Sequence, residues 1–315
     1  MSSMEQQKCR RVTLIGAGTI GLSFAALHLL HSSESRPIEV TIYDTRHDIE
    51  DYIRSTLPGY CLQQADRVST WFSDGTLKIS HDLAGAVKGA HIVQEQGPEN
   101  IGFKASIWPL IEDHCSPDCL LWSSTSGIPA SAQSKNMRDP SRLLVVHPYN
   151  PPHIMPLLEV VPSAVTKPEL VTRTVEFWRS LGREPVVIKK EVTGFVANRL
   201  AFALFREAIH LVNDGVATVE DIDKVVQASM GPRWTVAGPF KSYHAGGGQG
   251  GLEAFFKNIG GTVQDCWSDS GKLNIGDGWE EQVFDQTKEA YGVVDTGERD
   301  RRTMRILNAV LQKSD

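Results

Sequence analysis

The 315-residue sequence lacks any apolar run of the roughly 18 residues that a membrane-spanning helix needs. Its polar start, M-S-S-M-E-Q-Q-K-C-R, has the pattern of neither a signal peptide nor a transit peptide. Long blocks of like charge are also missing, and the net charge of −6 at pH 7 is unfavourable for binding nucleic acid or an anionic membrane. We therefore expect a cytoplasmic protein with no nucleic-acid or membrane partner.

Cysteine is scarce and scattered along the chain. The five cysteines contain no C-x-x-C pair and no zinc-ligand spacing; they are Cys9, Cys61, Cys115, Cys119 and Cys266. An odd number without such a pattern is typical of reduced thiols that pack against their neighbours. We expect no metal site.

Apolar residues, by contrast, make up 41% of the chain, and its length indicates about two domains. Up to about residue 190, short apolar runs alternate with amphipathic stretches. We expect strands at 77–79, 91–94, 120–123, 143–146, 158–161 and 186–188, and helices at 82–87, 101–113 and 168–181. This alternation predicts an α/β domain with a doubly wound, mostly parallel sheet.

Helical periodicity replaces this alternation from Gly194 onward. The D-G pair at 214–215 ends one expected helix, and Thr218 has the position of an N-cap for the next. No strand-like pattern returns, so we predict domains at 1–190 and 191–315, the second all-helical. The glycine-rich segment 245–251 is compatible with a flexible loop, a lid or an ordered turn beside the active site.

The most informative motif is V-T-L-I-G-A-G-T-I-G-L at 12–22, followed by V-T-I-Y-D ending at Asp44. Gly16 permits a tight turn, Gly18 lets the backbone approach a pyrophosphate, and Gly21 allows close helix packing. Asp44 lies 23 residues after Gly21, where a carboxylate can accept the ribose hydroxyls of NAD and repel the 2′-phosphate of NADP. This pattern predicts a Rossmann-type NAD site formed by Gly16, Gly18, Thr19, Ile20, Gly21 and Asp44. The alternative is a structural glycine turn.

An enzyme that oxidises a hydroxyl with NAD needs a base for the hydroxyl proton. His147 follows the expected strand at 143–146, at the edge where open α/β sheets bind ligands. Glu159 interrupts the apolar run L-L-E-V-V, where a carboxylate is costly unless paired, and an imidazole is a suitable partner. A core histidine and an edge-strand glutamate are the structural alternatives.

Two further polar residues fall at informative positions. Ser126 ends S-S-T-S after the expected strand at 120–123, and Asn198 lies in T-G-F-V-A-N-R-L, one turn into the first helix of the second domain. Taken alone, Ser126 would be a plain turn serine and Asn198 a surface amide of the helix.

In this order, the motifs G-A-G-T-I-G, S-S-T-S, H-P-Y-N-P, L-L-E-V-V and G-F-V-A-N-R-L resemble the 3-hydroxyacyl-CoA dehydrogenase superfamily over nearly the whole chain. The resemblance implies a catalytic set of Ser126, His147, Glu159 and Asn198. It places Asn150 near the substrate, and Glu99 and Lys104 near the nicotinamide ribose. It also implies a homodimer formed through the second domain, which the apolar helix at 195–212 makes plausible.

Within the superfamily, Q-E-Q-G-P-E-N, H-P-Y-N-P-P and G-P-R-W-T-V-A-G-P-F are similar to the lambda-crystallin branch, whose enzymes oxidise L-gulonate at C3. The segment S-Y-H-A-G-G-G is similar to L-carnitine dehydrogenases. The segment between Asp44 and Leu77 is short and carries only Arg46, Arg54 and Arg67 as strong cations, whereas the acyl-CoA enzymes use a longer, lysine-bearing lobe. This departure favours a free acid over a thioester.

The resulting hypothesis is an NAD-dependent dehydrogenase of a small, L-gulonate-like 3-hydroxy acid. His147 takes the C3 hydroxyl proton, Glu159 holds the ring, and Ser126 and Asn198 bind the substrate oxygen. Arg233 is a candidate for the substrate carboxylate, with a solvated surface charge as the alternative. L-carnitine and 3-hydroxyacyl-CoA remain alternative substrates, and a non-catalytic crystallin-like or NAD-binding protein is the alternative of a different class.

Overall fold

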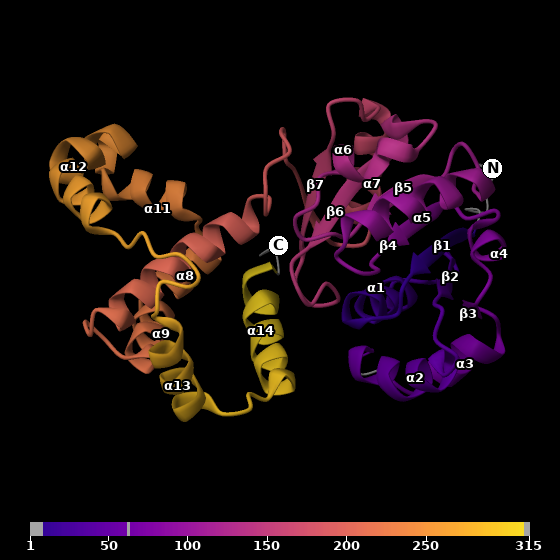
Figure 1. Cartoon of the computed structure of the whole chain (residues 1–315), viewed down its shortest axis with the longest axis horizontal. Coiled ribbons are helices and arrows are strands. Elements are labelled where there is room, and N and C mark those ends of the chain that lie inside the picture. Colours follow the sequence, from indigo (N-terminus) through magenta and orange to yellow (C-terminus); the bar gives the residue numbers. More distant parts are fainter. Residues whose placement is uncertain (1–8, 62–63, 312–315) are drawn as a thin grey trace, which may run out of the picture. The chain divides into compact units, whose positions relative to one another are not determined.

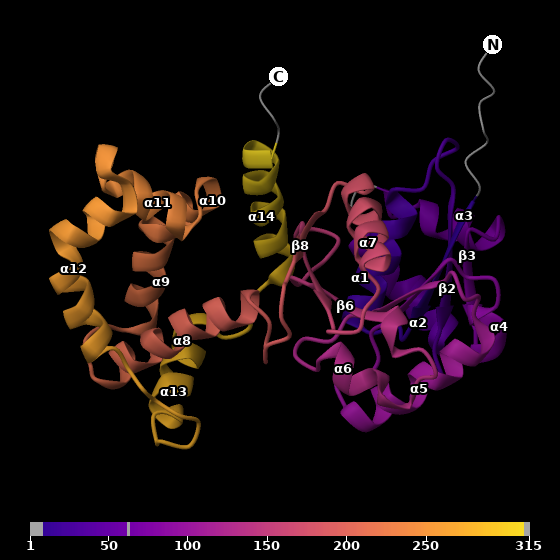
Figure 2. The ribbon, with the colours of Figure 1, turned by 90° about the horizontal axis from the view of Figure 1, so that it is seen from above.

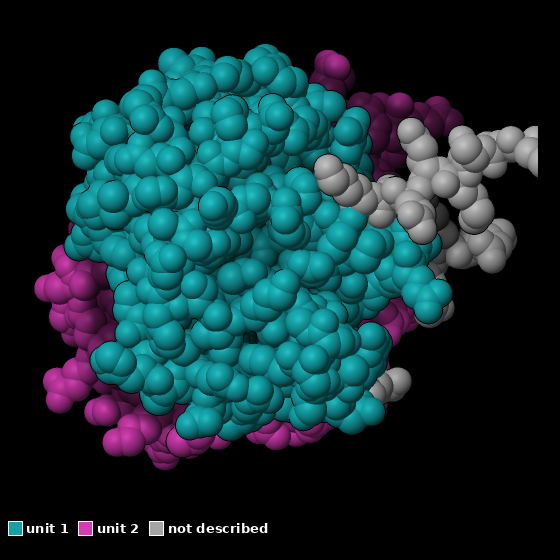
Figure 3. Space-filling model, turned by 90° about the vertical axis from the view of Figure 1, so that its right-hand side faces the viewer, with its two compact units in different colours: residues 1–199 teal, residues 200–315 magenta. Residues whose placement is uncertain are grey.

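A computed structural model describes residues 9–61 and 64–311. The chain forms two compact units, residues 1–199 and 200–315 (Figure 3). The division falls inside a helix, nine residues beyond the boundary expected at 190. Residues 191–199 join the first unit because Phe195 is buried in one of its cores.

The first unit is built on one eight-stranded sheet in the order β3-β2-β1-β4-β5-β6-β7-β8 (Figure 1; β8 is labelled in Figure 2). Neighbouring strands are parallel except β6 and β7, which are antiparallel. The strands are β1 (Arg10–Ile15), β2 (Ile38–Tyr43), β3 (Leu77–Ser80), β4 (Ile92–Glu95), β5 (Leu120–Ser123), β6 (Leu143–Pro148), β7 (Leu157–Pro162) and β8 (Glu184–Val187). The predicted mostly parallel α/β domain is confirmed.

Helices cover both faces of this sheet, which buries its central strands completely. In β6, Leu144 and Val146 pack into one core, and Leu143 and Val145 pack into the other. Helices α1 (Thr19–Leu30) and α7 (Pro168–Ser180) cover the first face, and α5 (Ile101–His114) covers the second (Figure 2). Shorter helical segments complete the unit: α2 (Ile49–Thr56), η1 (Leu57–Tyr60), α3 (Arg67–Ser73), α4 (Leu83–Val87), α6 (Ala130–Gln133), η3 (Ser134–Asn136) and η4 (Pro140–Arg142).

The described part of the second unit is helical and contains no strand, as predicted. Its helices are α8 (Ala197–Asn213), which begins in the first unit, α9 (Val219–Ala228), α10 (Met230–Val236), α11 (Pro239–Gly246), η5 (Gly248–Gly250), α12 (Gly251–Asp269), α13 (Glu280–Tyr291) and α14 (Thr296–Leu311). The Thr218 side chain accepts a hydrogen bond from the Asp221 N–H and caps α9, which confirms that prediction. The glycine-rich segment 245–251 is an ordered junction between α11 and α12. Among the described residues, no helix combines the length and apolarity needed to cross a membrane.

The glycines of the turn between β1 and α1 differ in their structural roles. Gly16 has φ +98°, in the left-handed region that favours glycine. A Cβ atom on Gly21 would lie 2.0 Å from the carbonyl oxygen of Gly16, whereas one on Gly18 would meet nothing within 4 Å. Gly21 is therefore required by packing, and Gly18 faces open space at the start of the helix.

This difference separates the effects of two alanine substitutions. We expect Gly21→Ala to lower the free energy of unfolding by about 1–3 kcal/mol, because its methyl group overpacks the turn. Gly18→Ala should leave the melting temperature unchanged but weaken NAD binding, because its methyl group occupies the space a pyrophosphate would approach. Thermal unfolding without cofactor and NAD titration of each variant measure the two effects. Equal melting temperatures for the two variants would contradict this account of the turn.

Candidate active site

The polar residues singled out in the first unit gather at one edge of the sheet. Because β1 to β6 run parallel, their carboxyl ends lie at the same edge. The glycine turn follows β1, Ser126 follows β5, and His147 lies near the end of β6. The order of the strands reverses between β1 and β4, and such a switch point is where open α/β sheets bind ligands.

His147 and Glu159 form a hydrogen-bonded pair across two neighbouring strands. They are direct partners in the antiparallel β6–β7 register, and Nδ1 of His147 lies 2.8 Å from Oε2 of Glu159. Both residues are buried, with exposed fractions of 6% and 2%. The predicted pairing is confirmed. The expected strand end at Val146 was wrong by two residues, because pairing with β7 extends β6 to Pro148 and places His147 inside the strand.

The second oxygen of Glu159 binds the start of α8. Oε1 accepts hydrogen bonds from the N–H groups of Val196 and Ala197, at 2.8 and 3.0 Å. Burial alone would raise the pKa of Glu159, but the hydrogen bonds from His147 and from these two N–H groups outweigh it and lower that pKa below its ordinary value. The carboxylate therefore stays charged beside the imidazole.

Phe195 shapes this arrangement, although nothing in the sequence reasoning assigned it a function. Gly194 and Phe195 have φ values of +73° and +52°, and the latter is unusual for a residue with a side chain. This turn aims the next two N–H groups at Glu159. The buried Phe195 ring also packs against His147, with the ring centroids 5.4 Å apart. The sequence signal that could have indicated this turn is a glycine directly before an aromatic residue at the start of a helix.

A second buried ion pair joins β4 to α5. Nζ of Lys104 lies 2.9 Å from each carboxylate oxygen of Glu95, and both side chains are at most 1% exposed. The Gly97 N–H and the Ser123 hydroxyl also donate to Glu95. Sequence reasoning missed Glu95, which ends a buried strand at the same edge as the other site residues. The expected role of Lys104 near the ribose stays a prediction.

Glu99, Ser126 and Asn198 lie within one hydrogen-bond network. Glu99 Oε1 accepts from the Ser126 N–H at 3.0 Å and from the Thr125 hydroxyl, while its Oε2 is 3.7 Å from Nζ of Lys104. Nδ2 of Asn198 donates to the Ser126 carbonyl at 3.3 Å. These contacts bring the start of α8 to the loop after β5.

Two of the predicted substrate residues lie outside this network. Asn150 is exposed in the loop after β6, and Arg233 is exposed on α10 in the second unit. Their assignment to the substrate stays a prediction.

Asp44 directly follows β2 and is already engaged within the protein. Its Oδ2 accepts from the Ala17 N–H at 2.9 Å, and its Oδ1 accepts from Nε of Arg46 at 3.2 Å. Partial burial raises the pKa of Asp44, but the hydrogen bonds from Arg46 and Ala17 outweigh it and lower that pKa. The Arg46 guanidinium also stacks 4.4 Å from the ring centroid of Tyr52.

These features fit a dinucleotide. Gly18 supplies no side chain to cap the first N–H groups of α1, so they remain available for an anion. The open space above Gly18 allows a phosphate to approach the backbone, and Asp44 holds a carboxylate beside the turn. Thr19 and Ile20 begin α1, and Gly21 packs it against the turn.

Comparison with known proteins identifies the family. The model of the 3-hydroxyacyl-CoA dehydrogenase NAD-binding domain matches residues 11–192, and that of the C-terminal domain matches residues 194–270. The chain belongs to the 3-hydroxyacyl-CoA dehydrogenase family. It is an NAD-dependent dehydrogenase that acts on a CH–OH group.

Several relatives cover most of the chain. L-carnitine dehydrogenase of Streptomyces coelicolor is 33% identical over 312 residues, 96% of this chain and 95% of the relative. A 3-hydroxyacyl-CoA dehydrogenase of Gibberella moniliformis is 36% identical over 259 residues, 80% of this chain and 77% of the relative. The crystal structure of 5-formyl-3-hydroxy-2-methylpyridine 4-carboxylic acid 5-dehydrogenase, an NAD⁺-dependent dismutase, has a TM-score of 0.79 and 29% identity over 98% of this chain and 100% of its own. The expected superfamily is confirmed.

Asp44 and Arg46 give a testable account of cofactor preference. We expect the unmodified protein to prefer NAD, because the Asp44 carboxylate repels a 2′-phosphate. Asp44→Ser removes that repulsion and releases Arg46, so the ratio of the Kd values for NADP and NAD should fall on the order of tenfold or more. Titration of both cofactors measures the ratio. In the double variant Asp44→Ser/Arg46→Ala, NADP binding relative to NAD should improve less than in Asp44→Ser. An unchanged ratio of Kd values in Asp44→Ser would refute the assignment.

The lowered pKa of Glu159 predicts a pH-dependent loss of stability. At pH 7, Glu159→Gln should reduce the free energy of unfolding by about 1–3 kcal/mol, because it weakens hydrogen bonds to a charged acceptor. The folded-state pKa lies below the ordinary value of 4.5, so the stabilisation by the charge is complete above that value and is lost as the pH falls through the folded-state pKa. The stability gap between the two proteins should therefore narrow in acid.

Denaturant unfolding at pH 7, 5, 4 and 3.5 checks this pH dependence. Glu169→Gln, on the exposed face of α7, is a matched control that should stay within about 0.5 kcal/mol of the unmodified protein. A gap that widens below pH 4.5 would show that Glu159 is not held as a stabilised carboxylate.

Proposed function

We propose that the protein oxidises the 3-hydroxyl group of a small, free 3-hydroxy acid, with NAD as the acceptor. The His147–Glu159 pair is the observation that carries the proposal. A buried carboxylate that accepts from Nδ1 of a histidine fixes the orientation of the ring and stabilises its protonated form. Nε2 of His147 is then the nitrogen that takes the hydroxyl proton. When bound, NAD supplies the hydride acceptor.

Ser126 and Asn198 are proposed to bind the substrate oxygen. Their backbone-to-side-chain contact places them at the same edge of the sheet as His147. A hydroxyl and an amide can each donate to the oxygen that becomes a carbonyl. Glu99 positions this loop, because it accepts from the Ser126 N–H and the Thr125 hydroxyl.

A free acid is favoured over a thioester by the segment that follows β2. Each of its strong cations is engaged within the protein rather than presented to a CoA nucleotide. Arg46 binds Asp44; Arg54 pairs with Glu50 at 2.6 Å and stacks on Phe72. Arg67 bonds to the side-chain oxygen of Gln64 and stacks on Trp71.

L-carnitine is the first substrate that we propose. It replaces L-gulonate as the leading expectation, because relatives named as L-carnitine dehydrogenases match nearly the whole chain at 31% to 33% identity. Exposed aromatic residues of α10 and α11 are of the kind that bind a quaternary ammonium, although Arg233 and Lys241 on the same helices carry positive charges that would repel it. These aromatic residues are Trp234, Phe240 and Tyr243. L-gulonate remains the second candidate.

A homodimer and a cytoplasmic location belong to the same proposal. Apolar side chains on α8 support the dimer, since Leu200, Phe202 and Phe205 are all exposed by 59% or more. Sedimentation as a monomer at micromolar concentration would argue against it.

Side-by-side kinetics test the substrate. We expect kcat/KM for L-carnitine to exceed the values for L-gulonate, 3-hydroxybutyrate and 3-hydroxybutyryl-CoA, measured by nicotinamide absorbance. His147→Gln should leave NAD binding nearly intact and reduce turnover by on the order of 10² to 10⁴, the usual contribution of a positioned base. A preference for the thioester would overturn the free-acid proposal. Near-normal turnover of His147→Gln would return the histidine to a structural role.

A further inference from the structure

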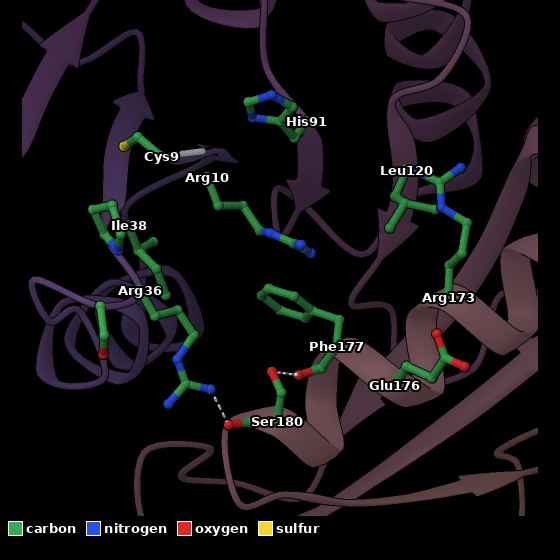
Figure 4. A pocket seen from close by; sticks show the side chains of 12 residues that line it. Cys9, Arg10, Arg36, Ile38, His91, Leu120, Arg173, Glu176, Phe177 and Ser180 are labelled. Carbon is green, nitrogen blue, oxygen red and sulfur yellow. Dashed lines mark hydrogen bonds between the residues drawn. The ribbon is translucent and has the colours of Figure 1, made fainter. Parts of the chain in front are cut away.

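A cavity of about 680 Å³ lies at the edge of the sheet opposite the candidate active site (Figure 4). It is lined by Arg10 and Ile38 at the starts of β1 and β2, by Leu120 at the start of β5, and by one face of α7. These are the amino ends of parallel strands whose carboxyl ends carry the site described above. The cavity is therefore separate from the residues proposed for catalysis.

Three arginines line this cavity: Arg10, Arg36 and Arg173. Figure 4 shows the Arg10 side chain extending into the space between His91 and Phe177, and its guanidinium lies 5.1 Å from the centroid of the Phe177 ring. Arg36 donates to the Ser180 carbonyl, and Arg173 donates to the Asp118 carbonyl at 3.1 Å. These contacts orient the two side chains with neutral acceptors that leave their charges uncompensated.

Few carboxylates approach these arginines: Glu39 contacts the lining residue Cys9, but its charge is paired with Lys78 at 3.3 Å. Within the described residues, no carboxylate lies within the 4.0 Å of a salt bridge to any of the three guanidinium groups. Among the described residues that line the cavity, Glu176 is the one acid, against three arginines. Burial, followed by the charges of Arg173 and Arg36, lowers the pKa of Arg10. A bound anion would relieve this repulsion.

We propose that the cavity binds the phosphate group of a small phosphorylated metabolite. Three guanidinium groups and one carboxylate leave a formal charge of +2, which matches a phosphate dianion, and guanidinium groups present paired donors to phosphate oxygens. The volume falls within the roughly 300–1,000 Å³ of small-molecule sites and exceeds the needs of phosphate alone. Ile38, Leu120 and Phe177 offer apolar surface for an organic portion.

Calorimetric titration of the full-length protein tests the site, with NAD present at saturation so that the glycine turn is filled. Pyrophosphate is the first probe, and inorganic phosphate and AMP distinguish a bare anion from a phosphorylated organic molecule. We expect Arg10→Gln and Arg173→Gln each to weaken pyrophosphate binding about tenfold, the loss of one charge-assisted contact. AMP should bind more tightly than inorganic phosphate.

Glu176→Gln supplies a change of opposite sign. It removes a negative charge from the lining, so pyrophosphate should bind several-fold more tightly, and this result does not depend on whether an arginine variant folds. Arg138→Gln is the matched control, because Arg138 pairs with Asp113 outside the cavity, and its affinity should equal that of the unmodified protein. Absence of pyrophosphate binding at millimolar concentration, or equal affinity in Arg10→Gln and Glu176→Gln, would overturn the proposal.

Discussion

The candidate active site depends on one buried negative charge, that of Glu159. A carboxylate with an exposed fraction of 2% is tolerated only where donors replace the water that it has lost. His147 provides one donor from the neighbouring strand, and Val196 and Ala197 provide two more from the start of α8. The same interaction thus holds the imidazole in place and fixes where the helix enters.

The reversal of strand direction at β7 makes this contact possible. Glu159 is the third residue of β7, so in a parallel pairing with aligned starts it would lie beside the third residue of β6 rather than beside His147, the fifth. Antiparallel pairing brings the two side by side on one face. The left-handed turn at Gly194 and Phe195 then directs the chain back towards the pair. The left-handed turn and the antiparallel strand therefore both position the hydrogen bonds of the Glu159 carboxylate.

Sequence reasoning captured the parts of the molecule that have short-range signals. The glycine turn, the strand at 120–123 and the cap at Thr218 are each specified by residues close in the sequence. The antiparallel direction of β7 was not predicted, because a strand buried on both faces has the same apolar pattern in either direction. Glu95 and Phe195 were missed for a related reason. Their importance arises from contacts with residues distant in sequence or from a backbone angle that the sequence does not display.

The contact between Arg46 and Asp44 was also not predicted, although the two residues are close in the sequence. In the sequence Arg46 counted as a cation of the segment after Asp44, whereas in the fold it is the partner of Asp44 itself. The roles of Asn150 and Arg233 depend on a substrate that the chain alone does not specify.

The ion pair between Glu95 and Lys104 constrains how this family member can diverge. With both side chains at most 1% exposed, losing either one strands the other charge in the interior. Single replacements at these positions are expected to be poorly tolerated, and removing both charges would still leave the Gly97 N–H and the Ser123 hydroxyl without their acceptor. Divergence at this ion pair therefore requires coordinated changes at several positions, because Lys104, Gly97 and Ser123 all depend on the same Glu95 carboxylate.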